Sequence, residues 1–99
     1  MNMQNIMAQA QRMQREINAK KEELEKMEFV GKSEWVEVTF TGGRVIKNVK
    51  IIKPGIINEE DKEILEDMIQ IATKDAFVQI NKAMSEKLGQ YAGALDGLM

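Results

Sequence analysis

Residues 35–52 read WVEVTFTGGRVIKNVKII, and this stretch decides the fold. Its first half alternates Val36, Val38 and Phe40 with polar residues, which is the period-two pattern of a strand with one buried face. Gly42-Gly43 interrupts the pattern. Apolar residues then resume on both faces of the chain: Val45, Val49 and Ile51 on one, Ile46 and Ile52 on the other. The two halves predict a β-hairpin closed by a turn that needs positive φ.

Phe29 and Val30, just before Gly31, provide a short third strand. So small a sheet is marginal in water, and its apolar face must be covered. Long helical patterns lie on both sides of it, over residues 2–28 and from the N-cap Asn58 to about Leu88. We therefore expect an α+β fold of helix, three-stranded antiparallel sheet and helix, in which both helices cover the sheet. Residues 1–88 form the single domain, and residues 89–99 a flexible, Gly-containing C-terminal tail.

The first helical pattern is longer than the sheet that it is expected to cover. It runs on the order of 40 Å, whereas strands of this length reach roughly 20 Å. An apolar stripe that overhangs its own sheet needs a partner, and a second copy of the chain is the simplest one. The sequence therefore predicts a homodimer. The candidate core and dimer residues are Met3, Ile6, Ala10, Met13, Ile17 and Leu24 on one heptad stripe, with Val36, Val38 and Phe40 on the hairpin.

Composition argues against most enzyme chemistry. The 99 residues include no Cys and no His, so thiol catalysis, Cys-ligated zinc and the commonest general base are missing. The carboxylates of residues 59–67 are best interpreted as the solvated start of a helix, not as a metal or acid–base site. No apolar run approaches the length of a membrane span, and no signal peptide is evident. We expect a cytoplasmic protein that is not an enzyme, with no cofactor, membrane or small-molecule substrate.

Charge is unevenly distributed along the chain. The net charge is −2, from 14 basic and 16 acidic residues. Residues 1–15 contain Arg12 and Arg15 and no acid, and residues 42–53 contain four cations and no acid. Acidic residues are concentrated instead at 22–28 and 59–67. The net charge by itself argues mildly against a nucleic-acid binder, but its distribution matters more, because two basic segments are separated from two acidic ones.

Four segments of the chain form a recognisable set. The second helix contains Asp61-x-Glu63-x-Leu65-Glu66-Asp67-Met68-Ile69, Ala72 and Asp75-Ala76. Elsewhere the chain contains Met3-Gln4-Asn5-Ile6-Met7-x-Gln9-Ala10-Gln11-x-Met13-Gln14, Phe29-Val30-Gly31-Lys32-Ser33 and Lys87-Leu88-Gly89-x-Tyr91-Ala92-Gly93. In their order and spacing, these segments resemble the YbaB/EbfC family of bacterial nucleoid-associated proteins. The chain departs from the family pattern at Ser33-Glu34-Trp35, where a Gly-rich segment is usual. It departs again at Ile52-Lys53-Pro54, where the family has Asp-Pro after the last strand.

The resemblance implies a homodimer with projecting helices that binds double-stranded DNA with little sequence preference, alters its conformation and acts in nucleoid organisation and gene regulation. It offers no base-reading residue, so DNA contacts are predicted from charge alone. The candidates, in order, are Arg12, Arg15, Lys20 and Lys21 on the first helix; Lys82 and Lys87 on the second; and Arg44, Lys47 and Lys50 on the hairpin. Each of them is otherwise an ordinary solvated cation. The alternative hypothesis is a dimeric protein-interaction adaptor without direct DNA binding.

Overall fold

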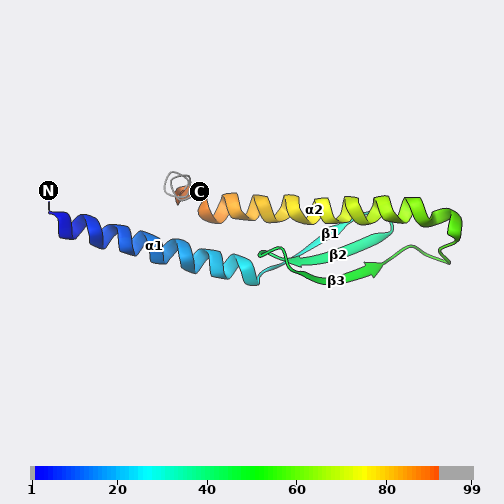
Figure 1. Ribbon diagram of the computed structural model, residues 1–99, viewed down its shortest axis with the longest axis horizontal. Helices are drawn as coiled ribbons and strands as arrows, with labels where there is room; N and C mark the ends of the chain where they lie inside the picture. Colours follow the sequence, from blue (N-terminus) through cyan, green and yellow to red (C-terminus); the bar gives the residue numbers. More distant parts are fainter. Residues whose placement is uncertain (1, 92–99) are drawn as a thin grey trace.

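The computed structural model describes residues 2–91, which form an elongated α+β molecule with principal extents of 70 × 19 × 16 Å (Figure 1). The elements in chain order are α1 (Met3–Lys26), β1 (Glu28–Lys32), β2 (Val36–Thr41), β3 (Ile46–Ile51), η1 (Glu59–Asp61), α2 (Lys62–Leu88) and η2 (Gly89–Tyr91). The predicted order of helix, three antiparallel strands and helix is confirmed. Of the predicted tail over 89–99, the first three residues form the 3-10 helix η2, and residues 92–99 lie outside the described part.

The sheet has the strand order β1-β2-β3, and both strand pairs are antiparallel. A register shift at Thr39/Phe40 places Phe40 opposite Ile46, while Val38 remains opposite Val49. Ile46, like Val49 and Ile51, is therefore opposite a residue on the buried face of β2. The prediction that Ile46 lies on the other face from Val49 and Ile51 is wrong. The reason is an extra residue in β3, because a bulge of this kind breaks strict alternation.

The hairpin turn places its positive φ one residue later than the two glycines. Among the described residues, positive φ values occur at Arg44, with φ of 62°, and at Gly55, with φ of 81°. Gly42 has a different role, because a Cβ on it would overlap the Leu24 carbonyl oxygen and stand 3.2 Å from the Glu25 nitrogen. Gly42 thus allows the hairpin to lie directly against the end of α1.

The main core lies between β2 and α2. Val36, Val38 and Phe40 are buried on one face of β2, as the sequence predicts. They meet small and branched residues spaced four apart on α2: Ala72, Ala76 and Ile80. Phe77 of α2 packs against Phe40 with their ring centroids 4.9 Å apart. Small side chains at 72 and 76 let α2 approach the sheet closely, and Gly31 of β1 sits against the same two residues.

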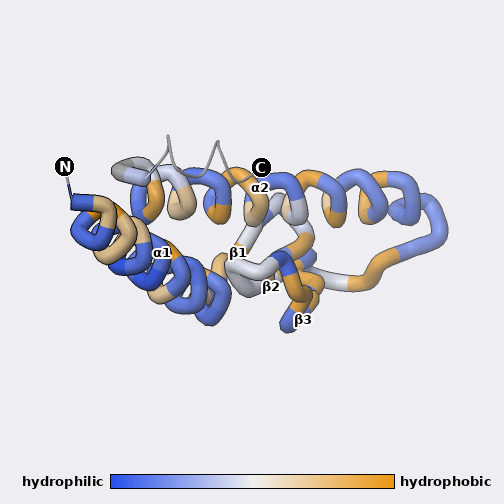
Figure 2. Tube along the Cα trace, turned by 60° about the vertical axis from the view of Figure 1, so that its left-hand side comes forward, coloured by the Kyte–Doolittle hydropathy of each residue, from blue (hydrophilic) through white to orange (hydrophobic). Residues whose placement is uncertain are grey.

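β3 remains outside this core. α2 packs over β1 and β2, and β3 lies at the edge of the sheet away from it (Figure 2). Val49 and Ile51 are therefore 49% and 51% exposed, although their partners Val38 and Val36 on β2 are fully buried. The apolar face of the sheet thus continues past the edge of the helix that covers it.

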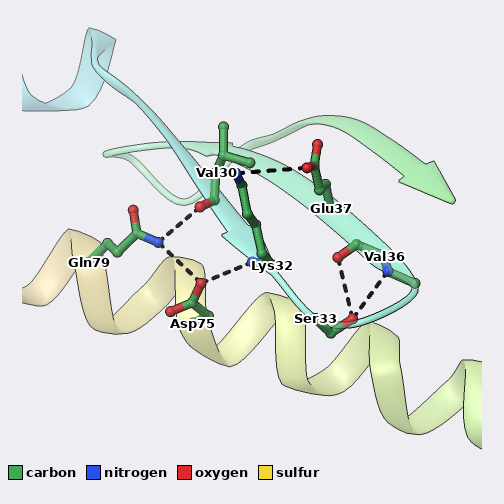
Figure 3. Close-up of polar contacts among 7 residues, drawn as sticks. All are labelled: Val30, Lys32, Ser33, Val36, Glu37, Asp75 and Gln79. Atoms are coloured by element: carbon green, nitrogen blue, oxygen red, sulfur yellow. Dashed lines mark hydrogen bonds and ion pairs between the residues drawn. The ribbon is translucent and has the colours of Figure 1, made fainter. Parts of the chain in front are cut away.

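The outer edge of β1 is closed by two polar side chains of α2 (Figure 3). The Asp75 carboxylate accepts the Lys32 backbone N–H at 2.9 Å, and the Gln79 amide donates to the Val30 carbonyl oxygen at 2.9 Å. Gln79 also donates to Asp75 at 3.2 Å. Edge strands expose backbone groups that invite further pairing, and these bonds satisfy two of them. α2 therefore blocks further strand pairing at the β1 edge of the sheet.

α1 does not cover the sheet, so the expectation that both helices do so is wrong. α1 meets the sheet only near its C-terminal end, where Leu24 is buried beside the hairpin, and it projects from there (Figure 1). A second, smaller core joins Ile17 of α1 to Leu88 and Tyr91. α2 alone buries the apolar face of β2, through the close approach at Ala72 and Ala76, and this leaves no part of that face for α1 to cover.

Candidate nucleic-acid interface

The N-terminal part of α1 is an arm that stands clear of the rest of the chain. Every side chain from Asn2 to Glu16 is exposed, and the first buried residue of α1 is Ile17. The Asn2 side chain caps the helix by accepting the Gln4 N–H at 3.0 Å. At 1.5 Å per residue, these 15 positions extend roughly 20 Å beyond the second core. We call residues 2–16 the arm.

Arg12 and Arg15 lie on the outward side of the arm. At 100° per residue, they are roughly 140° and 160° around the helix from the buried Ile17. Both side chains are exposed, and neither has an ion pair or hydrogen bond to another residue within 2–91. Two unpaired guanidinium groups one turn apart, on an element that no other part of residues 2–91 covers, suit contacts with successive phosphates.

Lys20 and Lys21 occupy a different side of α1. They flank Ile17, at roughly 60° on one side and 40° on the other, and both are partly buried along their length. Long side chains of this kind lay their stems on an apolar surface and keep the ammonium in water. Lys20 and Lys21 therefore border the second core, and the structure does not bring them onto the outward face of Arg12 and Arg15.

The two candidates on α2 differ in their surroundings. Lys82 is exposed and makes no ion pair within the described chain. Lys87 donates to the Glu23 carboxylate at 3.1 Å and is only partly exposed, so it ties the end of α2 to α1. A cation already held by a carboxylate must give up that contact before it binds a phosphate.

The hairpin candidates are also unequal. The Arg44 guanidinium donates to Asn81 Oδ1 at 2.6 Å and lies 5.8 Å from the centroid of the Phe77 ring, so α2 holds it in place. Lys47 and Lys50 are exposed on β3. The register places Lys50 opposite Glu37, so a carboxylate lies beside this cation. The hairpin is therefore a weaker candidate than the arm.

The structure does not gather the nine predicted cations into one surface. Arg12 is 13 residues before Glu25, against which the hairpin lies, so roughly 20 Å of α1 separates Arg12 from the hairpin. The acidic start of α2 is at the opposite end of the molecule from the arm (Figure 1). The uneven charge of the sequence thus becomes a spatial separation, with the arm as the basic end.

Long-range polar partners are the part of this interface that the sequence analysis missed. Asn81, Glu23, Glu16 and Tyr91 each hold a charged or polar group of a distant element. One signal was present, because Glu16 is the only acidic residue among residues 1–21. Within residues 2–91 no group of three or more carboxylates is arranged to hold a metal ion. In the same part of the chain, no helix is long and apolar enough to cross a membrane.

Comparison with known proteins gives a consistent result. The sequence model of the YbaB/EbfC DNA-binding family matches residues 1–95. A nucleoid-associated protein of Lactococcus lactis subsp. lactis is 43% identical over 97 residues, which cover 96% of this chain and 97% of that protein. A nucleoid-associated protein of Streptococcus pyogenes serotype M5 is 41% identical with the same coverage of both chains. The similarity therefore spans the arm, the sheet and α2 together.

Proposed function

This chain belongs to the YbaB/EbfC DNA-binding family, and on that premise we propose that it binds double-stranded DNA in the nucleoid with little sequence preference and alters its conformation. The arm carries the proposal, since it presents Arg12 and Arg15 on a rigid helix. Neither arginine is ion-paired to another residue within 2–91. Binding without base readout depends on phosphate contacts, which need cations on a fixed element and no special motif. A role in nucleoid organisation and gene regulation fits the names of the relatives, and the family indicates a binding protein, not an enzyme.

We propose further that the chain acts as a homodimer, and the uncovered face of β3 supports this. Ile46, Val49 and Ile51 continue the apolar face of the sheet beyond α2, and all three are about half exposed in a single chain. A contiguous exposed apolar strip of this kind marks an interaction surface. A second copy would cover β3 with the same strip from its own sheet, as two-fold symmetry requires. Two arms would then contact one duplex.

The test is a mobility-shift titration on random-sequence duplex, repeated over a series of salt concentrations. Replacing both Arg12 and Arg15 with Ala removes four cations from a dimer. The slope of log affinity against log salt should flatten by up to roughly 3.6 if all four contact phosphate, and affinity should fall alike for all sequences. Folding should be unchanged, because exposed substitutions of this kind usually cost less than about 0.5 kcal/mol.

A matched control removes the same charge from α2. Lys62 and Lys74 are exposed there: Lys62 is in the first turn, at the end of the molecule away from the arm, with Glu59 at 3.4 Å, and Lys74 is near the middle of the helix. Replacing both with Ala should leave the salt slope nearly unchanged. Equal losses in the two double variants would mean that net charge matters and the arm does not. Absence of salt-sensitive DNA binding by the unaltered chain would contradict the proposal and favour the adaptor hypothesis, with the exposed Met side chains of the arm as its contact surface.

A further inference from the structure

Glu16 is an acidic residue placed among the cations of α1. It is four residues after Arg12 and four before Lys20, and side chains at this spacing are neighbours on a helix surface. A glutamate that precedes a lysine by four residues is in the more favourable order for pairing. Glu16 would therefore be expected to pair with Lys20 or Arg12. The pair with Arg12 would engage a cation that the proposed DNA contact needs.

The structure shows a different partner for Glu16. The Tyr91 hydroxyl donates to Glu16 Oε2 at 2.9 Å, across 75 positions of sequence. The Tyr91 ring is 7% exposed and packs with Ile17 and Leu88, so the position of the hydroxyl is fixed by the second core. Glu16 makes no ion pair within residues 2–91, although Arg12 and Lys20 are both one turn away.

We propose that Tyr91 is a positioning residue for DNA binding: it holds the Glu16 carboxylate and so keeps Arg12 available for phosphates. This inference rests on the proposed function, because it needs the arm to be the element that contacts DNA. It assigns a task to a residue of η2 that does not itself touch the duplex. The hydrogen bond leaves the charge of Glu16 in place and changes only the groups that it can reach.

The size of the effect follows from the strength of helix-surface ion pairs. Without the hydroxyl, Glu16 is free to pair with Arg12, and DNA must break that pair to recruit the cation. Pairs of this spacing are weak, so one pair per protomer lowers the affinity of a dimer about two- to fivefold. The loss should be largest at low salt, because exposed ion pairs are screened as salt increases.

The experiment is a double-mutant cycle with Tyr91→Phe and Glu16→Gln, read by the same duplex titration over a salt series. In the Glu16→Gln variant the amide oxygen at position 16 still accepts the Tyr91 hydroxyl, so the tether to η2 survives while the charge is removed. We expect Tyr91→Phe to weaken binding in the native background and to have no effect in the Glu16→Gln background. Glu16→Gln alone should strengthen binding, since it removes a negative charge beside phosphate.

Ile17→Val is the matched control for stability. It trims the same small core by one methylene, costing about 0.5–1.5 kcal/mol, and leaves the hydroxyl and the carboxylate in place. Its melting curve, followed by circular dichroism, should shift about as much as that of Tyr91→Phe, with no change in DNA affinity.

Three results would overturn the inference. The first is a Tyr91→Phe variant that binds DNA as tightly as the unaltered chain, and the second is an equal weakening of binding by Ile17→Val. The third is an equal loss from Tyr91→Phe in both backgrounds, which would mean that the tyrosine only orients the arm. Failure of the proposed function is a separate observation, since it is seen as an absence of salt-sensitive binding in the unaltered chain.

Discussion

Replacing Gly31 with Ala should strongly destabilise the fold, because β1 and α2 touch there through their backbones. A Cβ at residue 31 would overlap the Ala72 carbonyl oxygen and stand 2.6 Å from the Ala76 nitrogen and 2.7 Å from the Ala76 Cβ. Moving the last of these to an ordinary contact of 3.4 Å needs a shift of about 0.7 Å, and the carbonyl needs more. Neither neighbour is a flexible side chain, so α2 itself must move away from the sheet.

That movement would also loosen the packing of Val36 and Val38 beneath α2 and weaken the Asp75 and Gln79 bonds to β1. Overpacking a well-filled core costs typically 1–3 kcal/mol, and we expect about 3 kcal/mol here because only backbone can yield. For a domain of this size, the melting temperature should fall by roughly 12–24 °C. The assay is thermal unfolding followed by circular dichroism at one fixed protein concentration, since dimer formation would make the melting temperature depend on concentration.

Gly89→Ala is the control for this prediction. Gly89 has helical angles, φ −58° and ψ −35°, and an added Cβ would meet no described residue within 4 Å. That substitution should leave stability unchanged or raise it by up to about 1 kcal/mol, because alanine loses less backbone freedom on folding. A Gly31→Ala protein that melts with the unaltered chain would refute the claim that α2 is held at backbone contact with β1.

Two further predictions concern the sheet edges and can be checked with the same purified protein. Asp75→Ala should lower the free energy of unfolding, measured by chemical denaturation, by about 1–3 kcal/mol, because the Lys32 N–H loses its acceptor. Asp75→Asn should lower it less, because the amide oxygen still accepts this hydrogen bond. Equal losses in the two variants would mean that the bond is unimportant. Val49→Asp should convert a dimer to a folded monomer in sedimentation equilibrium, since Val49 is half exposed in one chain. Ile17→Asp should instead unfold the chain, because Ile17 is only 1% exposed. A dimer that survives Val49→Asp would exclude β3 from the interface.

Local pattern predicted the elements well, because their causes are local. Alternation marked β2, periodicity marked both helices, and α2 ends at Leu88 as expected. The failures came from contacts between elements. The bulge in β3 shifts the pairing register of Ile46 by one residue, and the pattern of apolar residues in the hairpin does not predict this shift. The expectation that α1 covers the sheet assumed that an apolar stripe packs on the nearest strands, whereas Ile17 packs instead on Leu88 and Tyr91, at the far end of the sequence.

The candidate interface shows the same division. The acid-free start of α1 and the unpaired Arg12 and Arg15 could be predicted, because exposed charges on a helix depend on sequence spacing alone. Which of the other cations are already engaged could not be predicted. Arg44 is held by Asn81, 37 residues away, and Lys87 by Glu23, 64 residues away. Such pairs depend on how α1, the hairpin and α2 are placed relative to one another, and a single sequence contains no direct record of that.

The arm raises a physical question, because it is helical without burying anything. An isolated helix of 15 residues is marginal in water, since its first turn is costly to form. The arm avoids that cost by continuing a helix whose second half is fixed at Ile17 and Leu24, and Asn2 caps its free end. Its residues are mostly good helix formers. The backbone that carries Arg12 and Arg15 is therefore ordered in the free chain, so the proposed phosphate contacts would lose little backbone entropy. Two small contact regions at one half of α1 thus hold the other half as a helix.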